Sequence, residues 1–131
     1  MMTLDEARDF FYKDVFASKA LGAVIDEISE NRVVCSFDIG DIHKNAIGLV
    51  MGGAIYTLCD FAFAVASNSG DKRTVTTTST VTFLSAAKGK KLIAVACPIK
   101  DGRTMCTYEV MVTDDLGTKV AHVVINGNHI S

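Results

Sequence analysis

Residues 46–66 read AIGLVMGGAIYTLCDFAFAVA, and Asp60 carries the only charge in this stretch. The segment is apolar enough to raise the question of a membrane span. A carboxylate within it and the glycines that precede it make a spanning helix unfavourable. We therefore expect a helix over residues 52–67 that is buried in a protein core. Because such a helix has almost no polar face, a sheet must wrap around it or a second subunit must cover it.

The sequence on either side of this helix predicts one more helix and several strands. Apolar residues at spacings of three and four predict a short amphipathic helix over residues 3–16, with Thr3 or Asp5 as its cap. Elsewhere the apolar period is two, which is typical of strands. Strands are expected over residues 24–28, 33–39, 74–84, 91–99, 104–113 and 118–129. The predicted order is helix, hairpin, long helix and four strands in an antiparallel meander, which makes an α+β domain.

Length and composition indicate a single compact domain over residues 1–131, since 49% of the residues are apolar and 21% are charged. The net charge of −2 argues against a basic surface for nucleic acid. The acidic N-terminus lacks the features of a signal peptide, so we expect a cytoplasmic protein with neither nucleic acid nor membrane as a partner. The cysteines are too widely spaced for the close pairs of zinc sites, so we expect reduced thiols and no metal. They are Cys35, Cys59, Cys97 and Cys106.

The start of the apolar helix has features that suit acyl-transfer chemistry. Gly52 and Gly53 lie where backbone N–H groups have no intrahelical partner and where the helix dipole favours negative charge. These amides could hold a developing oxyanion. Asp60 follows about two turns later, and a carboxylate there is unfavourable unless it is paired, hydrogen-bonded or used. A structural role for Asp60 is the alternative that the residues alone leave open.

A motif in this region resembles that of the hotdog-fold acyl-CoA thioesterases, specifically the phenylacetic-acid-degradation subfamily. The motif reads His43-x-Asn45-x-x-Gly48-x-x-Met51-Gly52-Gly53, followed by Asp60. The resemblance spans almost the whole chain and includes residues 74–87 and the Gly102-Arg103 turn. It implies the hotdog fold, in which an antiparallel sheet wraps around a long central helix, with a short N-terminal helix. It also implies an acyl-CoA substrate, no cofactor, and a homodimer or a homotetramer built as a dimer of dimers.

The resemblance also implies roles for individual residues. Asp60 is expected to activate water or to attack the thioester carbonyl, and the Gly52 N–H to bind the thioester oxygen. Asn45 is expected to orient the water or the carbonyl. Thr76 matches the hydroxyl that positions the acid or the water, with Thr78 next on the same face. In this family the acid and the loop groups come from different subunits, so we expect the active site to exist only in a dimer.

Further residues are expected to contact the substrate. Met51 stands where the family usually has histidine, so a flexible apolar group replaces a hydrogen-bonding ring. Gly53 and His43 lie beside it in the motif, although a loop histidine more often has a structural role. Lys88 and Arg103 lie at hairpin turns, where solvated charges are common. Both are candidates for contacts with the phosphates of coenzyme A.

The function that we expect is hydrolysis of the thioester of a small or medium acyl-CoA. The alternative is a hotdog protein that binds acyl thioesters without hydrolysing them, with catalysis weakened or lost through Met51. A hotdog dehydratase or hydratase is disfavoured because no histidine lies near Asp60 on the helix. His43 also lacks the proline-rich surroundings of the dehydratase histidine. His122 and His129 are expected on opposite faces of the last strand, so they should not bind a metal together.

Overall fold

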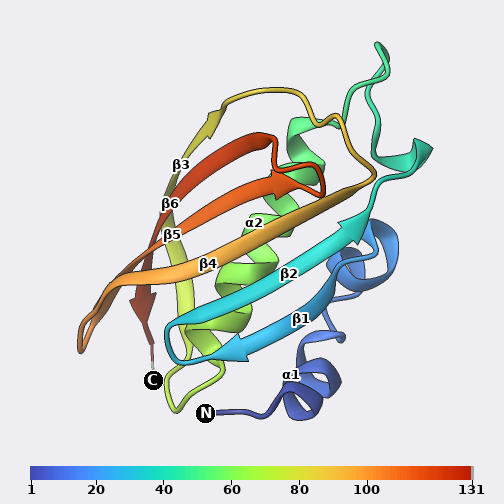
Figure 1. Ribbon diagram of the computed structural model, residues 1–131. Helices are drawn as coiled ribbons and strands as arrows, with labels where there is room; N and C mark the ends of the chain where they lie inside the picture. Colours follow the sequence, from blue (N-terminus) through green and yellow to red (C-terminus); the bar gives the residue numbers. More distant parts are fainter. Residues whose placement is uncertain (131) are drawn as a thin grey trace.

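The computed structural model describes residues 1–130 and contains one six-stranded antiparallel sheet that curves around a long helix (Figure 1). The helical elements are α1 (Leu4–Phe11), the π-helix η1 (Phe16–Leu21), the 3-10 helix η2 (Asp41–His43) and α2 (Gly52–Asn68). The strands are β1 (Val24–Ser29), β2 (Arg32–Asp38), β3 (Thr74–Phe83), β4 (Lys91–Asp101), β5 (Met105–Asp114) and β6 (Lys119–His129). The predicted α+β class, with a sheet around a central helix, is confirmed.

The apolar segment that opened the sequence analysis forms α2, which lies in the concave side of the sheet. Leu58, Cys59 and Ala62 are completely buried, and the helix packs against β2, β4 and β5. Burying a large apolar side chain stabilises a fold by roughly 1.5–3 kcal/mol, so this helix anchors the core. One stripe of α2, which includes Thr57 and Asp60, is left uncovered by the sheet. Among residues 1–130, no helix has the length and apolar character needed to cross a membrane.

α1 is shorter than the predicted helix over residues 3–16. Thr3 caps it as expected, since its Oγ1 accepts from the Glu6 N–H at 3.2 Å and Glu6 Oε1 accepts from the Thr3 N–H at 2.9 Å. The helix ends at Phe11, and the Tyr12 carbonyl accepts a hydrogen bond from Ser18 Oγ at 2.8 Å. The chain turns here and forms η1, which places Ala17 and Leu21 in the core. Sequence periodicity shows the apolar stripe but not this turn.

The strand order is β1-β2-β4-β5-β6-β3, so the prediction of a four-stranded meander is wrong. Only β4, β5 and β6 form a meander, while β3 pairs with β6 and lies at the edge of the sheet. The segment after β3 crosses back over the end of the sheet to reach β4, and the Leu84 N–H donates to the Val120 carbonyl at 2.8 Å. The alternation of apolar and polar residues predicts which segments form strands, but it does not show which strands pair with each other.

A β-bulge at Thr77 changes which face of β3 each threonine occupies. Thr76 pairs with Gly127 and Thr78 pairs with Asn126, so Thr77 is the extra residue. An extra residue reverses the alternation of side chains. Thr76 therefore faces α2, whereas Thr78 lies on the outer face and its Oγ1 accepts from Asn126 Nδ2 at 2.9 Å. The prediction that Thr76 and Thr78 share a face is wrong.

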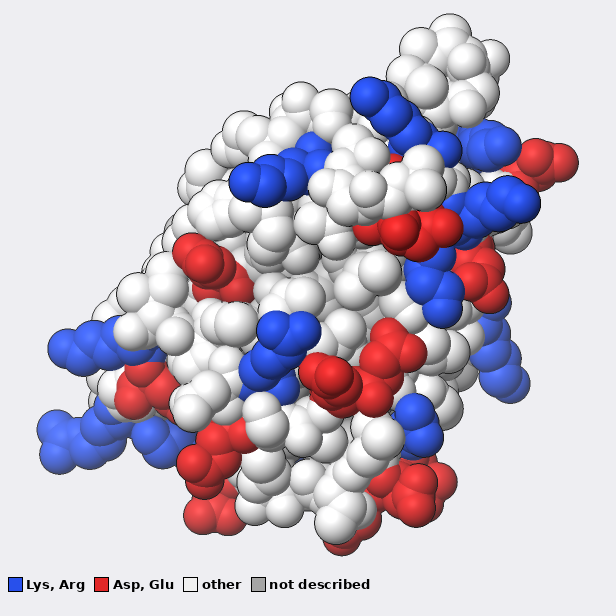
Figure 2. Space-filling model, in the orientation of Figure 1, with Lys and Arg blue, Asp and Glu red and all other residues white. Residues whose placement is uncertain are grey.

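Charged side chains of both signs are interspersed on the face of the molecule shown in Figure 2. Short ion pairs join neighbouring strands on the sheet, such as Arg32 with Glu27 at 3.3 Å and Lys91 with Asp38 at 3.8 Å. This face has no continuous basic area of the kind that the phosphates of a nucleic acid require.

Candidate active site

The start of α2 presents backbone donors that the chain itself does not use. Met51 is the N-cap residue, and its carbonyl accepts from the Ala54 N–H at 3.0 Å. The Met51 N–H donates to the His43 carbonyl at 2.8 Å, which fixes the loop against the helix. Within residues 1–130, the N–H groups of Gly52 and Gly53 have no hydrogen-bond partner, and no side chain caps the helix. The two amides are therefore free to bind an anionic oxygen.

Asn45 lies in the loop of residues 40–51, which projects from the domain next to the start of α2 (Figure 1). Its Oδ1 accepts from the Ile47 N–H at 3.1 Å and from the Leu49 N–H at 3.0 Å. The amide oxygen is therefore used to hold the loop, and only the NH₂ group remains to donate. Of the two predicted roles of Asn45, this geometry favours orienting the carbonyl, because the NH₂ group can donate to a carbonyl oxygen but cannot accept a proton from water.

Two cavities flank the helix start. The first, of about 350 Å³, has a mainly apolar wall formed by η1, η2 and the first turns of α2, and it includes Met51 and Gly53. The second, of about 340 Å³, includes Asn45 and Gly52. Phe83 closes one side of it, because a Cβ atom at Gly52 would lie 3.0 Å from Phe83 Cζ. The predicted groups Asn45, Met51, Gly52 and Gly53 thus come together around the two free amides.

His43 is buried beside the first cavity, and backbone groups occupy both of its ring nitrogens. The Gly40 N–H donates to Nδ1 at 2.9 Å, so Nε2 carries the proton and donates to the Leu21 carbonyl at 2.7 Å. The ring also packs against Phe37, with 4.3 Å between ring centroids. His43 therefore holds η1, η2 and β2 together. Only its ring surface is left to contact a substrate in the cavity.

Asp60 lies on the uncovered stripe of α2, eight residues after Gly52. At 1.5 Å per residue this is about 12 Å along the helix, so one chain does not place the two groups at one reacting carbonyl. The residue is exposed and has no hydrogen-bond or ion-pair partner among residues 1–130. The surrounding protein nevertheless desolvates the carboxylate, which raises the pKa of Asp60 above its ordinary value, and the negative charge of Asp14 adds to this effect.

Sequence reasoning assigned no role to the hydroxyl groups of Tyr56 and Ser79. Tyr56 lies one turn before Asp60 on α2, and its Oη is 2.6 Å from Ser79 Oγ on β3. Ser79 occupies the α2-facing side because of the bulge at Thr77, so it takes the place that Thr78 was predicted to have. Thr76 faces α2 as predicted, but no hydrogen bond joins it to Asp60 within the described chain. The available signal was a tyrosine four residues before the only acid of the helix.

Lys88 and Arg103 do not come together in one chain. Lys88 precedes β4 and Arg103 follows it, and this strand of 11 residues spans about 36 Å. The Lys88 backbone N–H donates to Asp114 Oδ2 at 2.8 Å, at the same end of the sheet as Gly52. Arg103 lies at the other end. A single chain can therefore offer only Lys88 to a ligand that is bound at the start of α2.

Comparison with protein families and curated relatives gives one consistent result. Residues 47–121 match the model of the thioesterase superfamily. A protein of Archaeoglobus fulgidus named "Putative esterase" is 31% identical over 119 residues, which cover 90% of this chain and 77% of that protein. A protein of the same name from Deinococcus radiodurans is 34% identical over 95 residues, which cover 72% of this chain and 65% of that protein.

Solved structures show the same fold. A thioesterase from Haemophilus influenzae has a TM-score of 0.89 at 16% identity, over 100% of this chain and 92% of its own. The PaaI protein from the phenylacetic acid degradation operon of E. coli has a TM-score of 0.85 at 23% identity, over 98% of this chain and 97% of its own. A hypothetical thioesterase from Streptococcus pneumoniae, solved with coenzyme A, has a TM-score of 0.85 at 23% identity. The match covers 94% of this chain and 96% of that protein. These likenesses confirm the hotdog fold. The family match and the curated relatives establish that the chain belongs to the thioesterase superfamily, which is named for the hydrolysis of thioesters.

Proposed function

We propose that this protein hydrolyses acyl-CoA thioesters, with Asp60 as the group that activates water and the Gly52 amide as the oxyanion donor. The observation that carries the proposal is the pair of free amides at the start of α2, which lie beside two open cavities. Asp60 supplies a carboxylate that has no hydrogen-bond or ion-pair partner among residues 1–130. The protein around Asp60 desolvates its carboxylate in part and raises its pKa, which supports use as a base.

The proposed reaction needs only these groups. Asp60 takes a proton from water while the water oxygen bonds to the thioester carbonyl carbon. The carbonyl oxygen becomes an oxyanion, and the Gly52 N–H stabilises it. When the carbonyl re-forms, the carbon–sulfur bond breaks, and the thiolate leaves and takes up a proton. The products are a carboxylic acid and a free thiol. In the variant pathway, Asp60 itself attacks the carbonyl, and water then hydrolyses the resulting anhydride.

The cavity around Met51 supports a small or medium acyl group as the substrate class. Its volume of about 350 Å³ is at the low end of ligand pockets, and its wall is mainly apolar. The Streptococcus pneumoniae protein was solved with coenzyme A, which supports a coenzyme A thioester here. Lys88 lies at the same end of the sheet and is the better placed of the two predicted phosphate contacts.

A second copy of the chain completes the proposed site. Within the part of the chain that the structure describes, the outer edge of β3 has no partner strand, and most of the strand is exposed. A long free edge is a template for pairing with another strand. The uncovered stripe of α2 lies next to this edge, so one interface would cover both. In the proposed homodimer, or a dimer of such dimers, Asp60 of one protomer serves Gly52 and Asn45 of its partner.

Release of free thiol from a panel of acyl-CoA substrates tests the proposal. Asp60→Asn should lower kcat by about 10²–10⁴-fold, because the base is lost while the shape of the side chain is kept. Asp9→Asn is the matched control, since Asp9 is an exposed carboxylate on α1. Its rate should equal that of the wild type. Equal background rates for the wild type and Asp60→Asn would refute hydrolysis at this site.

Met51→His separates hydrolysis from the alternative of binding without turnover. The free amides and Asp60 do not depend on the Met51 side chain, which lines the apolar cavity. We therefore expect Met51→His to change kcat by less than about tenfold, a change of about 1.4 kcal/mol in the barrier. A wild type that binds acyl-CoA without turnover, together with a Met51→His variant that hydrolyses it, would favour the binding protein.

A further inference from the structure

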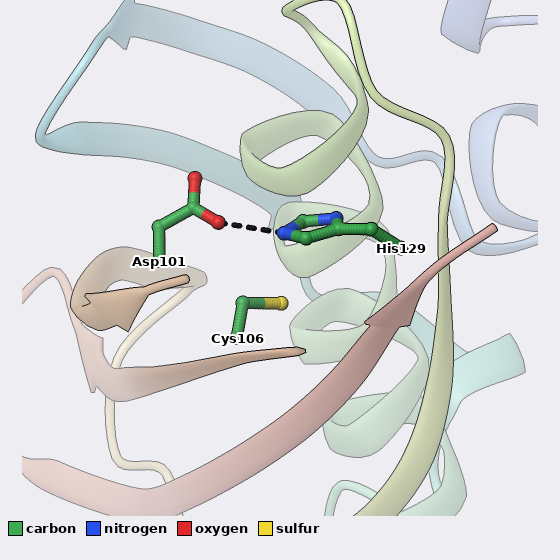
Figure 3. A group of neighbouring side chains, drawn as sticks. All are labelled: Asp101, Cys106 and His129. Carbon is green, nitrogen blue, oxygen red and sulfur yellow. Dashed lines mark hydrogen bonds and ion pairs between the residues drawn. The ribbon is translucent and has the colours of Figure 1, made fainter. Parts of the chain in front are cut away.

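Three side chains of metal-binding type meet at the end of the sheet remote from Gly52 (Figure 3). Asp101 ends β4, Cys106 lies at the start of β5 and His129 ends β6. One candidate ligand atom from each residue lies within 4.8 Å of the other two. The His129 side chain is 4% exposed and Cys106 is 3% exposed. We propose that Asp101, Cys106 and His129 bind a transition-metal ion of the Zn²⁺ class.

Hydrogen bonds already orient the His129 ring for this role. The Thr74 hydroxyl donates its only proton to the Ser67 carbonyl at 3.0 Å, so at 2.7 Å it must accept from His129 Nδ1–H. His129 Nε2 is thereby directed at Asp101 Oδ1, which lies 2.7 Å away. Histidines that bind metals usually donate their second N–H to another group, which fixes the ring and its tautomer. Thr74 fills this position.

The ion would replace the proton between His129 Nε2 and Asp101 Oδ1. Zinc bonds to nitrogen and oxygen are about 2.0–2.2 Å, so the two atoms would separate from 2.7 Å to about 3.4 Å in a tetrahedral site. The sulfur would lie about 3.6 Å from the nitrogen in such a site, and the candidate ligand atoms already lie within 4.8 Å of one another. Binding releases two protons, one from the thiol and one from the His129–Asp101 pair. The thiolate and the carboxylate then neutralise the charge of a divalent ion.

A cavity beside the cluster leaves room for a fourth ligand. Asp101 and His129 line a cavity of about 470 Å³. Its wall also carries the carboxylates of Glu30 and Asp71 and the ammonium group of Lys72. Lys72 Nζ is held by the Gly102 carbonyl at 3.0 Å. Met1, whose α-amino group balances the second carboxylate, also lines the cavity, and water in the cavity can complete a tetrahedral site.

The same three residue types could instead form a thiol nucleophile with its base, but the geometry disfavours that use. Both nitrogens of His129 are occupied, Nδ1 by Thr74 and Nε2 by Asp101, so neither is free to take the thiol proton. Cys106 is buried, and desolvation raises the pKa of its thiol. A metal ion removes this obstacle because it stabilises the thiolate directly.

Co²⁺ is the probe that tests the site, because thiolate ligation gives Co²⁺ a charge-transfer absorption band. Protein without an affinity tag should bind one Co²⁺ and show this band, and Zn²⁺ should abolish it. Cys106→Ser should lose the band. Cys97→Ser is the matched control, since Cys97 is a half-buried thiol on the outer face of β4, and it should keep the band. Thr74→Val should keep the band but weaken Co²⁺ binding by about 10–100-fold.

Two results would overturn the proposal: absence of the band in the wild type, or an equal band in Cys106→Ser. Circular dichroism and a thermal unfolding curve show whether each variant is folded. If Cys106→Ser does not fold, Asp101→Asn gives an independent test, because Asp101 is exposed. Its Co²⁺ affinity should fall by at least about tenfold, since one ligand is lost. An unchanged affinity would refute the site without bearing on hydrolysis at Asp60.

Discussion

The two ends of the sheet differ in how fully one chain satisfies its own polar groups. At the Gly52 end, two backbone amides are free, and the neighbouring loop exposes apolar side chains such as Ile47, which is 80% exposed. At the His129 end, hydrogen bonds run without interruption from the Ser67 carbonyl through Thr74 and His129 to Asp101. The first end therefore has donors available for a ligand, which supports the proposed shared site, whereas the polar groups of this chain at the second end are paired with one another.

Mixing two inactive variants tests whether the Gly52 end needs a second subunit, and we expect the largest change in hydrolysis rate from this experiment. Asp60→Asn and Gly52→Val should each lower kcat by at least about 100-fold, since one removes the base and the other blocks the oxyanion position. If the site is shared between protomers, a dimer of one chain of each kind contains one intact site. Random pairing should then restore about one quarter of the wild-type rate. The measurement is thiol release after co-expression or subunit exchange.

A mixture that stays as inactive as its components would refute the proposal that Asp60 and Gly52 of different protomers share one site. Gel filtration of each variant provides the control, because complementation requires that both still form dimers. Asp9→Asn mixed with Gly52→Val should give about half of the wild-type rate, since the Asp9→Asn chain retains both functional groups and each site needs one intact Gly52.

Gly127→Ala tests the closed end of the sheet and should have an intermediate effect. A Cβ atom at Gly127 would lie 2.8 Å from Phe63 Cζ, 2.8 Å from Thr74 Cγ2 and 3.0 Å from Cys106 Sγ. Overpacking of this kind lowers the free energy of unfolding by about 1–3 kcal/mol. Gly70→Ala is the matched control, since no atom lies within 4 Å of a Cβ there, and it should stay within about 0.5 kcal/mol. Urea unfolding measures the stability of both variants. Equal free energies of unfolding would show that the side chains around Gly127 can move aside to make room for a methyl group.

Asp14→Asn should have the smallest effect, a shift in the pH dependence of hydrolysis. The negative charge of Asp14 contributes to the raised pKa of Asp60. Asp60 must be ionised to accept a proton from water, so kcat/KM should rise with pH through its pKa. Removing the charge of Asp14 lowers that pKa, and the acidic limb of the profile should move to lower pH. Asp9→Asn should leave the limb in place, and an unmoved limb in Asp14→Asn would contradict the assignment of this limb to Asp60.

The sequence predicted the elements better than their arrangement. The helix expected over residues 52–67 is observed as Gly52–Asn68, because its burial is a property of the segment itself. The pairing of β3 with β6 and the bulge at Thr77 depend on contacts between distant strands, which alternation does not encode. For this reason the faces of Thr76 and Thr78 were assigned wrongly.

The residues of the candidate site were likewise predicted better than the contacts that they make. The motif located the free amides of Gly52 and Gly53, because helix starts leave such groups unpaired wherever they occur. It did not reveal that Asn45 uses its oxygen within the loop, or that His43 has both ring nitrogens occupied. The cluster of Asp101, Cys106 and His129 was not expected, because three strands bring it together and no spacing in the sequence reports it.

The position of β3 also bears on how the chain folds during synthesis. In the sheet of residues 1–130, β3 has one partner, β6, which is synthesised after the other five strands of that sheet, and Thr74 pairs with His129 across 55 positions. Until β6 emerges, α2 lacks part of its cover and the threonine-rich strand has both edges free. Contacts between such distant residues form slowly and expose apolar surface in the interim. We therefore expect nascent chains that stop before residue 119 to remain open and to need protection from aggregation.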